Sequence, residues 1–493
     1  MKQGTLPGSS RGWEPEIGRE SRPAQVRASV VAEKRCSKTP WSQGTQEADA
    51  SMEPNDERQK PTSTSASANN AARPAGDTAL RWKWVERSVW TDRMLMALER
   101  GVKGGRWYSL MDKVWSESNL MSSWLAVSAN DGAAGVDRQS IEAFRAHRDE
   151  ELQRLSQELR SDRYERQPAR RVWIDKPGSK EKRPLGIPCV RDRVVEGAVR
   201  QVLEPIFERE FAEHSYGFRP GHSAKQAVGR VEELLKVGYS WIVDADLKSY
   251  FDTIPQEPLL RLVGEQVSDR CLLRLIHQSL GAGVMEEMKG WEPTEQGTPQ
   301  GGVLSPLLAN LYLDPLDHLM AQSGYQMTRY ADDFVIQCRS QAEAEAALAA
   351  VREWTEQAGL RLHPEKTRIV EATQRGGFEF LGWHFERGYQ WPREKSQAKL
   401  RERVRQLTPR TSGQSLSQIV QQLNRSLRGW RAYFDHGVRN VYEDLDQLVR
   451  RRLRQLLLKR RGKRGKPQGS INYKWPNAYF DQLGLRRLAR VRQ

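Results

Sequence analysis

Two adjacent carboxylates, Asp332 and Asp333, lie between two runs of residues that favour β-strands. The runs are residues 325–329 and 334–338, and a strand, a tight turn and a second strand would place both acids at the tip of a hairpin. Aspartate is a common turn residue, so this pair by itself indicates only a solvated turn. A third acid, Asp246, ends another apolar, strand-like run far upstream. Together the three acids predict a carboxylate cluster, which is the kind of site that binds a hard divalent cation such as Mg²⁺.

Such a cluster has a specific chemical use. Two Mg²⁺ ions held there would activate an attacking 3′-hydroxyl and stabilise the leaving pyrophosphate of a nucleotidyl transfer. Like charges that are packed together repel each other, so the arrangement would be costly without cations. The cluster therefore predicts polymerase chemistry. Asp244 and Asp252 lie close to Asp246 in the sequence and are weaker candidates, and a structural role is expected for Asp252.

A series of short motifs surrounds these acids between about residues 105 and 385. In chain order, the motifs outside the acidic segments are Asn-Asp-Gly-Ala-Ala-Gly-Val-Asp (130–137), Lys-Arg-Pro-Leu-Gly-Ile-Pro (182–188), His-Ser-Tyr-Gly-Phe-Arg-Pro-Gly (214–221), Gly-Thr-Pro-Gln-Gly-Gly-Val-Leu-Ser-Pro (297–306), Leu-His-Pro-Glu-Lys-Thr (362–367) and Phe-Leu-Gly-Trp (380–383). Together with the acids, they resemble the successive blocks of the reverse transcriptase/maturase proteins encoded by bacterial group II introns. Residues 423–424 and 428–430 are similar to the maturase domain of that family, and residues 475–480 with 484–485 are similar to its class C branch.

The resemblance implies an α+β right-hand polymerase with fingers and a palm of antiparallel sheet plus helices, followed by an α-helical thumb or maturase domain X and a basic tail. The expected boundaries are 1–80 for a disordered leader, 81–240 for an N-terminal extension and the fingers, 241–385 for the palm with the catalytic acids, 386–460 for the thumb and 461–493 for a DNA-binding tail. Low-complexity sequence at residues 61–68 favours disorder in the leader. An over-long start-site assignment would explain the same stretch equally well.

Residue patterns predict particular elements within this fold. Apolar positions along one face predict a helix over residues 191–211, and a second helix is expected over 341–357, ending near Gly359. Residues 170–175 are typical of a strand that leads into a turn. Three or so helices are expected between 390 and 460, because apolar residues recur there at helical spacing.

The resemblance also implies roles around the acids. Asp246 and Asp332 would form the primary metal pair, whereas Asp333 would either bind metal or position the site. Phe251 would lie under the sugar of the incoming nucleotide, where its bulk would exclude a ribose 2′-hydroxyl and so select dNTPs. The alternative for Phe251 is an aromatic residue of the core.

Basic residues near the fingers turn are expected to contact the nucleotide. Lys176 and Arg183 flank the turn at 177–181 and would close over the triphosphate, with Arg183 offering a bidentate contact. Lys180 and Lys182 compete with Lys176 for this role. As isolated surface residues, these lysines would instead be solvated.

Three further residues take their expected roles from the resembling motifs. Gln300 would contact the nucleotide or the template, and the glycines that follow it allow close backbone approach at a crowded site. Lys366 would protonate pyrophosphate or support the active-site loop. For Arg219, a phosphate contact and a buried ion pair are both open.

The charge of the chain indicates a polyanionic partner. The net charge is +16, and residues 450–493 hold fifteen Lys or Arg residues against the single acid Asp481, so this end carries +14 and the rest only +2. The aromatic residues Tyr473, Trp475, Tyr479 and Phe480 interleave with these charges and would offer stacking surfaces, although a solvated disordered end is the alternative. The residues expected to bind nucleic acid are Arg428, Trp430, Arg460, Arg461, Lys463, Arg464 and Lys466.

The cysteines and the apolar runs exclude several classes of protein. The four cysteines, at 36, 189, 271 and 338, show no paired spacing, which argues against a disulfide framework and a Cys-based zinc site. Because no cysteine follows Cys338, the zinc-containing His-Asn-His nuclease domain of many such proteins is expected to be absent. No run of 18 apolar residues or apolar signal segment is present, so a bacterial cytoplasmic location without membrane insertion is expected.

The predicted function is that of an RNA-directed DNA polymerase and maturase. Such a protein would bind group II intron RNA, assist its splicing and copy it into DNA at a target DNA site, using Mg²⁺ and dNTPs. One alternative is a non-catalytic RNA-binding splicing factor, against which the retained acids argue. Another is a reverse transcriptase recruited to a host role such as phage defence, against which the maturase-like thumb and basic tail argue. A monomer and a homodimer both remain open.

Overall fold

The computed structural model describes residues 81–102, 104–175, 182–286, 289–462 and 469–489, which belong to one compact unit. The expected leader at 1–80 lies outside the described residues. Among the described helices, none combines the length and the apolar character needed to cross a membrane.

The first part of the described chain is mainly helical. Its helices are α2 (Asp92–Arg100), α3 (Met111–Val114), α4 (Glu117–Asn130), α5 (Ile141–Ala146), α6 (Arg148–Arg160) and α7 (Val190–Glu208). Helix α7 confirms the helix predicted over 191–211, and it packs closely against α4. A Cβ atom at Gly197 of α7 would lie 2.2 Å from the Ser123 hydroxyl of α4, so this close approach requires glycine.

A four-stranded sheet of the fingers region carries the segment expected to bind the triphosphate. Its strand order is β2 (Lys182–Ile187), β1 (Ala169–Asp175), β4 (Val284–Glu286) and β5 (Gly290–Glu292). Strand β1 confirms the strand predicted over 170–175 and pairs antiparallel with β2, with Ile174 opposite Arg183. The turn between β1 and β2 lies outside the described residues.

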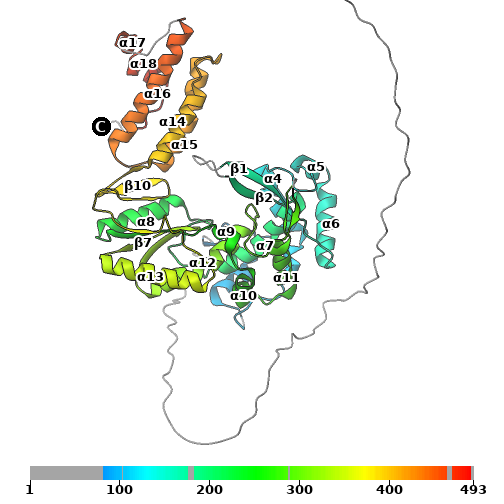
Figure 1. The fold of residues 1–493 in the computed structure, drawn as a ribbon. Coiled ribbons are helices and arrows are strands. Elements are labelled where there is room, and N and C mark those ends of the chain that lie inside the picture. Colours follow the sequence, from blue (N-terminus) through cyan, green and yellow to red (C-terminus); the bar gives the residue numbers. More distant parts are fainter. Residues whose placement is uncertain (1–80, 103, 176–181, 287–288, 463–468, 490–493) are drawn as a thin grey trace, which may run out of the picture. The chain divides into compact units, whose positions relative to one another are not determined.

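The palm is a four-stranded antiparallel sheet, as expected. Its order is β6 (Gln326–Tyr330), β7 (Asp333–Cys338), β3 (Trp241–Asp246) and β8 (Arg368–Glu371). Helix α8 (Ala224–Lys236) covers one face, and α12 (Ser305–Gln322) and α13 (Gln341–Gln357) cover the other (Figure 1). The short helices α9 (Tyr250–Thr253), α10 (Gln256–Gln266) and α11 (Arg270–Gly281) follow β3.

Both faces of the central strands are buried, which explains why β3 and β7 read as apolar runs. Ile242 and Val335 pack into the cluster that contains α8, whereas Val243 and Ile336 pack into the cluster that contains α12 and α13. A strand buried on both faces shows no polar alternation. Helix α13 confirms the helix predicted over 341–357.

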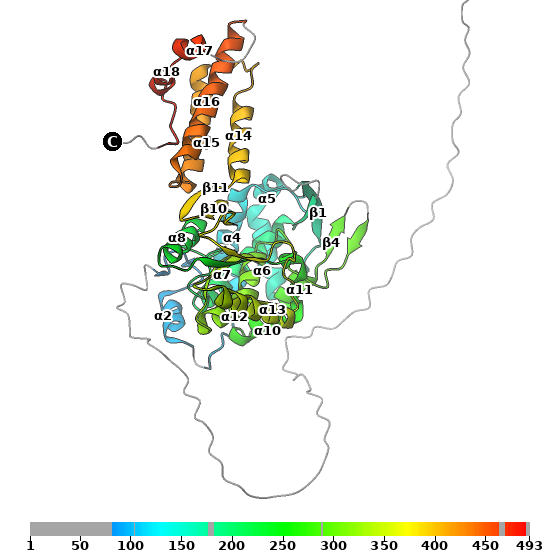
Figure 2. The same ribbon diagram turned by 60° about the vertical axis from the view of Figure 1, so that its left-hand side comes forward.

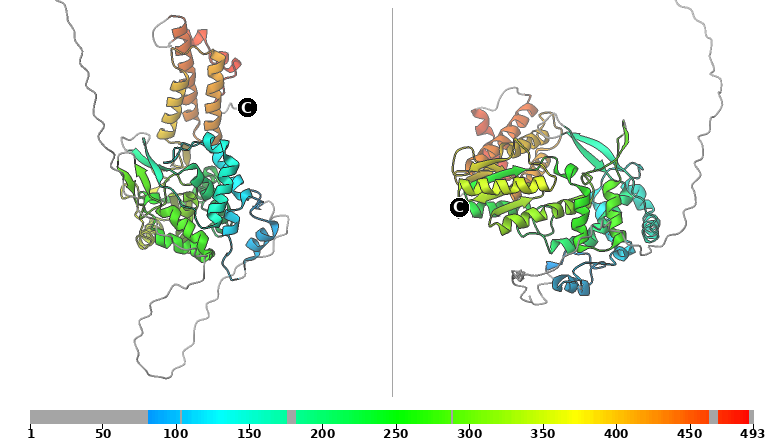
Figure 3. Two further views of the ribbon diagram at one scale, coloured as in Figure 1. Left: turned by 90° about the vertical axis from the view of Figure 1, so that its right-hand side faces the viewer. Right: turned by 60° about the horizontal axis from the view of Figure 1, so that its bottom comes forward.

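The C-terminal region is a helical bundle that follows a small sheet of β9 (Phe378–Phe380), β10 (Trp383–Glu386) and β11 (Tyr389–Pro392). Helices α14 (Glu394–Leu407), α15 (Leu416–Tyr433) and α16 (Arg439–Arg460) run side by side, as Figures 2 and 3 show in orange and red. They confirm the three or so helices expected between 390 and 460. A capping box at Ser415 fixes the start of α15.

Within the segment expected to be a basic tail, the described residues 469–489 fold back onto this bundle. It forms α17 (Ser470–Lys474) and α18 (Asn477–Gln482), and Phe480, Leu485 and Leu488 are buried against the bundle core. The carboxylate of Asp446 on α16 accepts the backbone N–H groups of residues 488 and 489. The expectation that Trp475 and Phe480 offer stacking surfaces is therefore wrong, because they are 6% and 0% exposed. Both rings instead help to fill the apolar core of the bundle, whereas Tyr473 is 89% exposed.

Candidate active site

The palm sheet brings the three predicted catalytic acids together. Asp246 ends β3 and lies directly opposite Asp333, the first residue of β7. Asp332 stands in the turn of the hairpin between β6 and β7, after Ala331, which has a left-handed φ of 59°. The hairpin and its position beside the Asp246 strand thus agree with the prediction from sequence.

The loop that carries Lys366 is fastened to the same strand end. The backbone N–H of His363 donates to the Asp246 carbonyl at 2.7 Å, and the backbone N–H of Lys248 donates to the Arg361 carbonyl at 2.8 Å. These bonds bring the Lys366 ammonium into an ion pair with the Asp246 carboxylate. Lys366 therefore stands among the acids, where it can support the active-site loop or meet a phosphate.

The acids form an electrostatically strained cluster. Burial and then the charges of Asp244, Asp246 and Asp332 raise the pKa of Asp333 to about 7. Burial also raises the pKa of Asp332 above its ordinary range; the Asp246 charge raises it further, while Arg183 and Lys366 partly oppose this. Carboxylates that resist ionisation together in this way provide a strong electrostatic reason to bind cations.

The carboxylates present fit a metal ion whose coordination is completed by the substrate. In the described part of the chain, no group of three or more His, Cys, Asp or Glu side chains is arranged as a preformed metal cage. Mg²⁺ is usually held by one or two carboxylates together with water and substrate phosphates. Asp246 and Asp332 supply such carboxylates, so the residues present fit this ion.

A polar chain joins the fingers sheet to Asp252, in the short helix that follows β3. The Arg183 guanidinium donates to the Gln300 side-chain carbonyl at 3.0 Å, and the Gln300 amide donates to the Asp252 carboxylate at 3.2 Å. Arg183 is also close enough for its charge to lower the pKa of Asp332 against the opposing effects of burial. Two residues expected to contact the nucleotide, Arg183 and Gln300, thus lie side by side next to the acids. Asp252 positions Gln300, which agrees with the structural role expected for it.

Close backbone contacts set the position of Gln300. The backbone N–H of Gly186 in β2 donates to the Gln300 carbonyl at 2.7 Å. A Cβ atom at Gly301 would lie 2.2 Å from the Gly186 carbonyl oxygen, and Gly301 has a φ of 106°, so only glycine fits. The backbone N–H of Thr298 donates to the Phe251 carbonyl at 2.7 Å, which ties the same loop to the segment after β3.

Phe251 is half-buried rather than a full core residue. Its ring packs edge-on against Tyr250, with a centroid distance of 5.7 Å. Tyr250 is fully buried, and its hydroxyl donates to the Ala309 carbonyl at 2.6 Å. The Phe251 ring is therefore supported by the buried Tyr250 and stays partly accessible.

The remaining predicted residues lie in several places. Lys176, Lys180, Lys463, Arg464 and Lys466 lie outside the described residues. Lys182 is exposed at the start of β2. Asp244, two positions before Asp246 on β3, forms an ion pair with Arg368 at 3.2 Å.

The four described residues among those expected to bind nucleic acid lie at different places on the bundle. Arg428 is exposed on α15, but the Trp430 ring packs on Phe434 at 4.7 Å and is half-buried. Arg460 donates to backbone carbonyl groups of the α14–α15 loop, and the Arg461 guanidinium lies 5.0 Å above the Trp475 ring. These residues do not form one cluster with each other.

A groove of about 820 Å³ is present on the bundle. It is lined by residues of α14, α16 and the C-terminal segment, among them Arg401, Arg451, Arg454 and Tyr473. Guanidinium groups beside an exposed aromatic ring are suited to a phosphate backbone and a stacked base. The sequence pointed to Tyr473 and to the basic segment that begins at residue 450, which includes Arg451 and Arg454, but not to Arg401 of α14.

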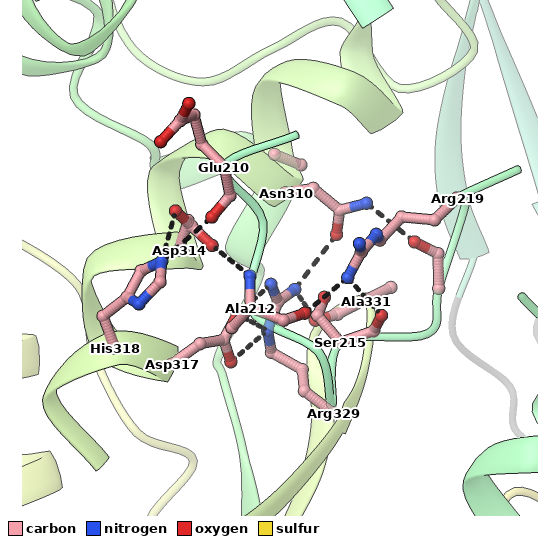
Figure 4. Close-up of polar contacts among 12 residues, drawn as sticks. Glu210, Ala212, Ser215, Arg219, Asn310, Asp314, Asp317, His318, Arg329 and Ala331 are labelled. Atoms are coloured by element: carbon pink, nitrogen blue, oxygen red, sulfur yellow. Dashed lines mark hydrogen bonds and ion pairs between the residues drawn. The ribbon is translucent and has the colours of Figure 1, made fainter. Parts of the chain in front are cut away.

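A buried polar network that supports the acids was missed by the sequence analysis. The Arg329 side chain on β6 is fully buried, and its guanidinium forms a bidentate ion pair with Asp317 of α12 (Figure 4). It also donates to the Asn310 side chain at 3.0 Å and to the Ala331 carbonyl at 2.9 Å. Ala331 immediately precedes Asp332, so Arg329 holds the catalytic turn directly. The available signal was the set Asn310, Asp314 and Asp317, polar residues at helical spacing in a segment that is otherwise mostly apolar.

The same network holds the segment before α8. Asn310 donates to the Gly217 carbonyl at 2.7 Å, and a Cβ atom at Gly217 would lie 2.3 Å from the Ala331 backbone nitrogen. Arg219 pairs with Glu208 and donates to the carbonyl groups of Ala212 and Ser215, part of which Figure 4 shows. Of the two roles left open for Arg219, the structure therefore shows the buried ion pair.

Comparison with known proteins identifies two domains in this chain. A family model for reverse transcriptase (RNA-dependent DNA polymerase) matches residues 174–385, and a model for the group II intron maturase-specific domain matches residues 397–475. Both ranges contain the elements described above: the first holds the acids, and the second holds the helical bundle.

Individual proteins are similar to parts of this chain. Protein YkfC of Escherichia coli (strain K12) is 34% identical over 290 residues, which are 51% of this chain and 74% of that protein. The group II intron-encoded protein LtrA of Lactococcus lactis subsp. cremoris is 40% identical over 181 residues, which are 37% of this chain and 30% of LtrA. A solved partial Cas6-RT-Cas1–Cas2 complex matches 50% of this chain and 41% of that chain with 25% identity and a TM-score of 0.33. The chain belongs to the family of group II intron-encoded reverse transcriptases that carry a maturase domain.

Proposed function

We propose that this protein copies its own intron RNA into DNA with dNTPs and Mg²⁺, and that it binds that RNA to assist splicing. The observation that carries the catalytic part is the convergence of Asp246, Asp332 and Asp333 with the Arg183–Gln300 pair. The maturase-specific domain and the basic groove on the bundle support RNA binding. The target DNA and a bacterial cytoplasmic location belong to the same proposal.

Each residue would have a separate task in this reaction. Asp246 and Asp332 would hold Mg²⁺, which supplies activation of the 3′-hydroxyl and charge stabilisation of the departing pyrophosphate. Arg183 would hold the triphosphate, and Gln300 would align the nucleotide from the fixed loop that it shares with Gly301. Lys366 would exchange its ion pair with Asp246 for a contact with a phosphate oxygen, where it could deliver a proton.

The direct test is primer extension by the full chain on an RNA template, in parallel with splicing of a group II intron RNA. The proposal expects both Mg²⁺-dependent extension and faster splicing. Splicing assistance without extension by a folded protein would overturn the polymerase part and favour the non-catalytic splicing factor. Extension without any effect on intron RNA would overturn the maturase part.

The first prediction concerns sugar selection. Phe251→Ala is expected to raise the efficiency of rNTP relative to dNTP incorporation by roughly tenfold to a hundredfold, because removal of the ring leaves room for a 2′-hydroxyl. The measurement is single-nucleotide incorporation of dNTP and rNTP at several concentrations. Phe251→Tyr keeps the bulk and serves as the matched control. An unchanged ratio in Phe251→Ala would contradict the assigned role.

The second prediction concerns the metal and does not depend on activity. Adding Mg²⁺ at about ten times its dissociation constant to metal-free protein should raise the stability by about 1.4 kcal/mol. The physical reason is that the cation relieves repulsion among the half-buried carboxylates. Thermal unfolding of wild type and Asp332→Asn, with and without Mg²⁺, measures this effect. An equal shift in both proteins would place the stabilising ion elsewhere.

A further inference from the structure

Phe218 combines two properties that a structural residue rarely has. Its side chain is 46% exposed, and its backbone has a left-handed φ of 58°. A bulky residue in this conformation is strained, because its Cβ atom crowds its own backbone. Burial does not compensate for this strain, because much of the large apolar side chain stays in solvent. Such strain is found mainly where a function requires the conformation.

The surrounding structure forces Phe218 into this position. On one side, Gly217 is pressed against Ala331, and its carbonyl accepts the Asn310 amide at 2.7 Å. On the other side, the buried Arg219 guanidinium pairs with Glu208 and so fixes the chain that follows. The residue between two such anchored neighbours cannot relax without disturbing them.

The Phe218 ring lies beside the catalytic hairpin. Its centroid is 6.5 Å from that of Tyr330, and the two rings are tilted by 41°. Tyr330 is directly opposite Asp333 in the hairpin and two residues from Asp332. Ala331, also left-handed, completes the same turn. Two left-handed non-glycine residues, Phe218 and Ala331, therefore lie next to the acids that must meet the primer terminus.

The position of the ring implies what it contacts. If Asp246 and Asp332 act on the primer 3′-hydroxyl, the last base pairs of the duplex must lie against the hairpin. An exposed aromatic ring at that place would pack on sugars and base edges, which every sequence presents, so the contact would tolerate any sequence. A ring fixed by its backbone loses little conformational freedom when it binds.

We propose that Phe218 is a contact surface for the primer–template duplex, within the first base pairs behind the primer 3′ end. This inference rests on the proposed polymerase function. It adds a residue that grips the product duplex to the acids and the nucleotide-binding residues. Its chemical partner is an RNA–DNA hybrid or the equivalent duplex, bound by packing rather than by charge.

Two substitutions separate this role from a structural one. Asparagine and glycine both adopt left-handed backbone more readily than phenylalanine, so Phe218→Asn and Phe218→Gly should keep or raise the melting temperature. Both should weaken binding of a fluorescent RNA–DNA primer–template by roughly tenfold and shorten the products made before dissociation. Leu125→Asn, which removes an exposed apolar side chain of 60% exposure from α4, is the matched control and should leave both readouts unchanged.

Each outcome bears on whether Phe218 contacts the primer–template duplex. Binding and product length equal to wild type in both Phe218 variants would overturn the inference, provided that wild type extends the primer. A large drop in melting temperature in both variants would show that the ring is structural and would also overturn it. Absence of extension by wild type would instead count against the polymerase function, so the two failures are distinguishable.

Discussion

Asp332→Asn is expected to reduce primer extension by at least about a thousandfold. The substitution removes one carboxylate of the proposed metal pair, metal stabilisation of a transition state is worth several kcal/mol, and about 1.4 kcal/mol changes a rate tenfold. The same substitution should not destabilise the fold, because burial and the Asp246 charge already oppose ionisation of Asp332. The measurement is single-turnover extension together with thermal unfolding of the metal-free protein. A stable but inactive variant is the expected result.

The matched control for this prediction is Asp244→Asn. Asp244 lies two positions before Asp246 on β3 but is paired with Arg368, so it should not be needed for the reaction. This variant should keep most of the extension rate. If both variants lost activity equally, the metal pair could not be assigned to Asp246 and Asp332. If Asp332→Asn kept its activity, the catalytic site would have to lie elsewhere.

The second large effect is expected at Arg329. Arg329→Met should lower the free energy of unfolding by about 3–5 kcal/mol, because it leaves the buried Asp317 carboxylate without its partner. The double variant Arg329→Met/Asp317→Leu should recover much of this loss, since an apolar pair can replace a buried ion pair. Neither variant can supply the hydrogen bond from Arg329 to the Ala331 carbonyl.

Comparison of the two variants separates stability from positioning. The double variant should fold but extend primers slowly, with the loss mainly in the rate constant at saturating dNTP rather than in KM. Chemical denaturation and extension over a range of dNTP concentrations measure both quantities. A double variant with full activity would show that the hairpin holds Asp332 without help from Arg329.

Much of the site was predictable because it is encoded by local patterns. The hairpin around Asp332, the strand that ends in Asp246 and helix α13 each follow from residues that are neighbours in the sequence. The order of the family's motifs along the chain then predicted that Arg183, Gln300 and Lys366 lie near the acids. The structure brings these residues together as expected, while their roles in binding nucleotide stay predictions.

What could not be predicted depends on contacts between distant segments. In the sequence, Arg329 is an ordinary polar residue of a strand. It is buried and paired with Asp317 only because α12 packs against that strand in the fold. Trp475 and Phe480 read as exposed rings in a basic tail, because nothing local shows that α16 has an apolar face for them. Phe218 stands in a motif whose sequence gives no sign of its left-handed backbone.

The strand order of the palm also has a consequence for how the protein folds. The central strand β3 can pair only after β7, whose partner residues lie between 87 (Asp246 to Asp333) and 97 (Trp241 to Cys338) positions later in the chain, and after β8 beyond it. Contacts between such distant segments form slowly, because a long loop must close first. The repulsion between Asp246 and Asp333 is consequently absent from early intermediates and arises only when the sheet is completed. A divalent cation should therefore slow unfolding far more than it speeds folding. Its main effect would be to stabilise the native state kinetically.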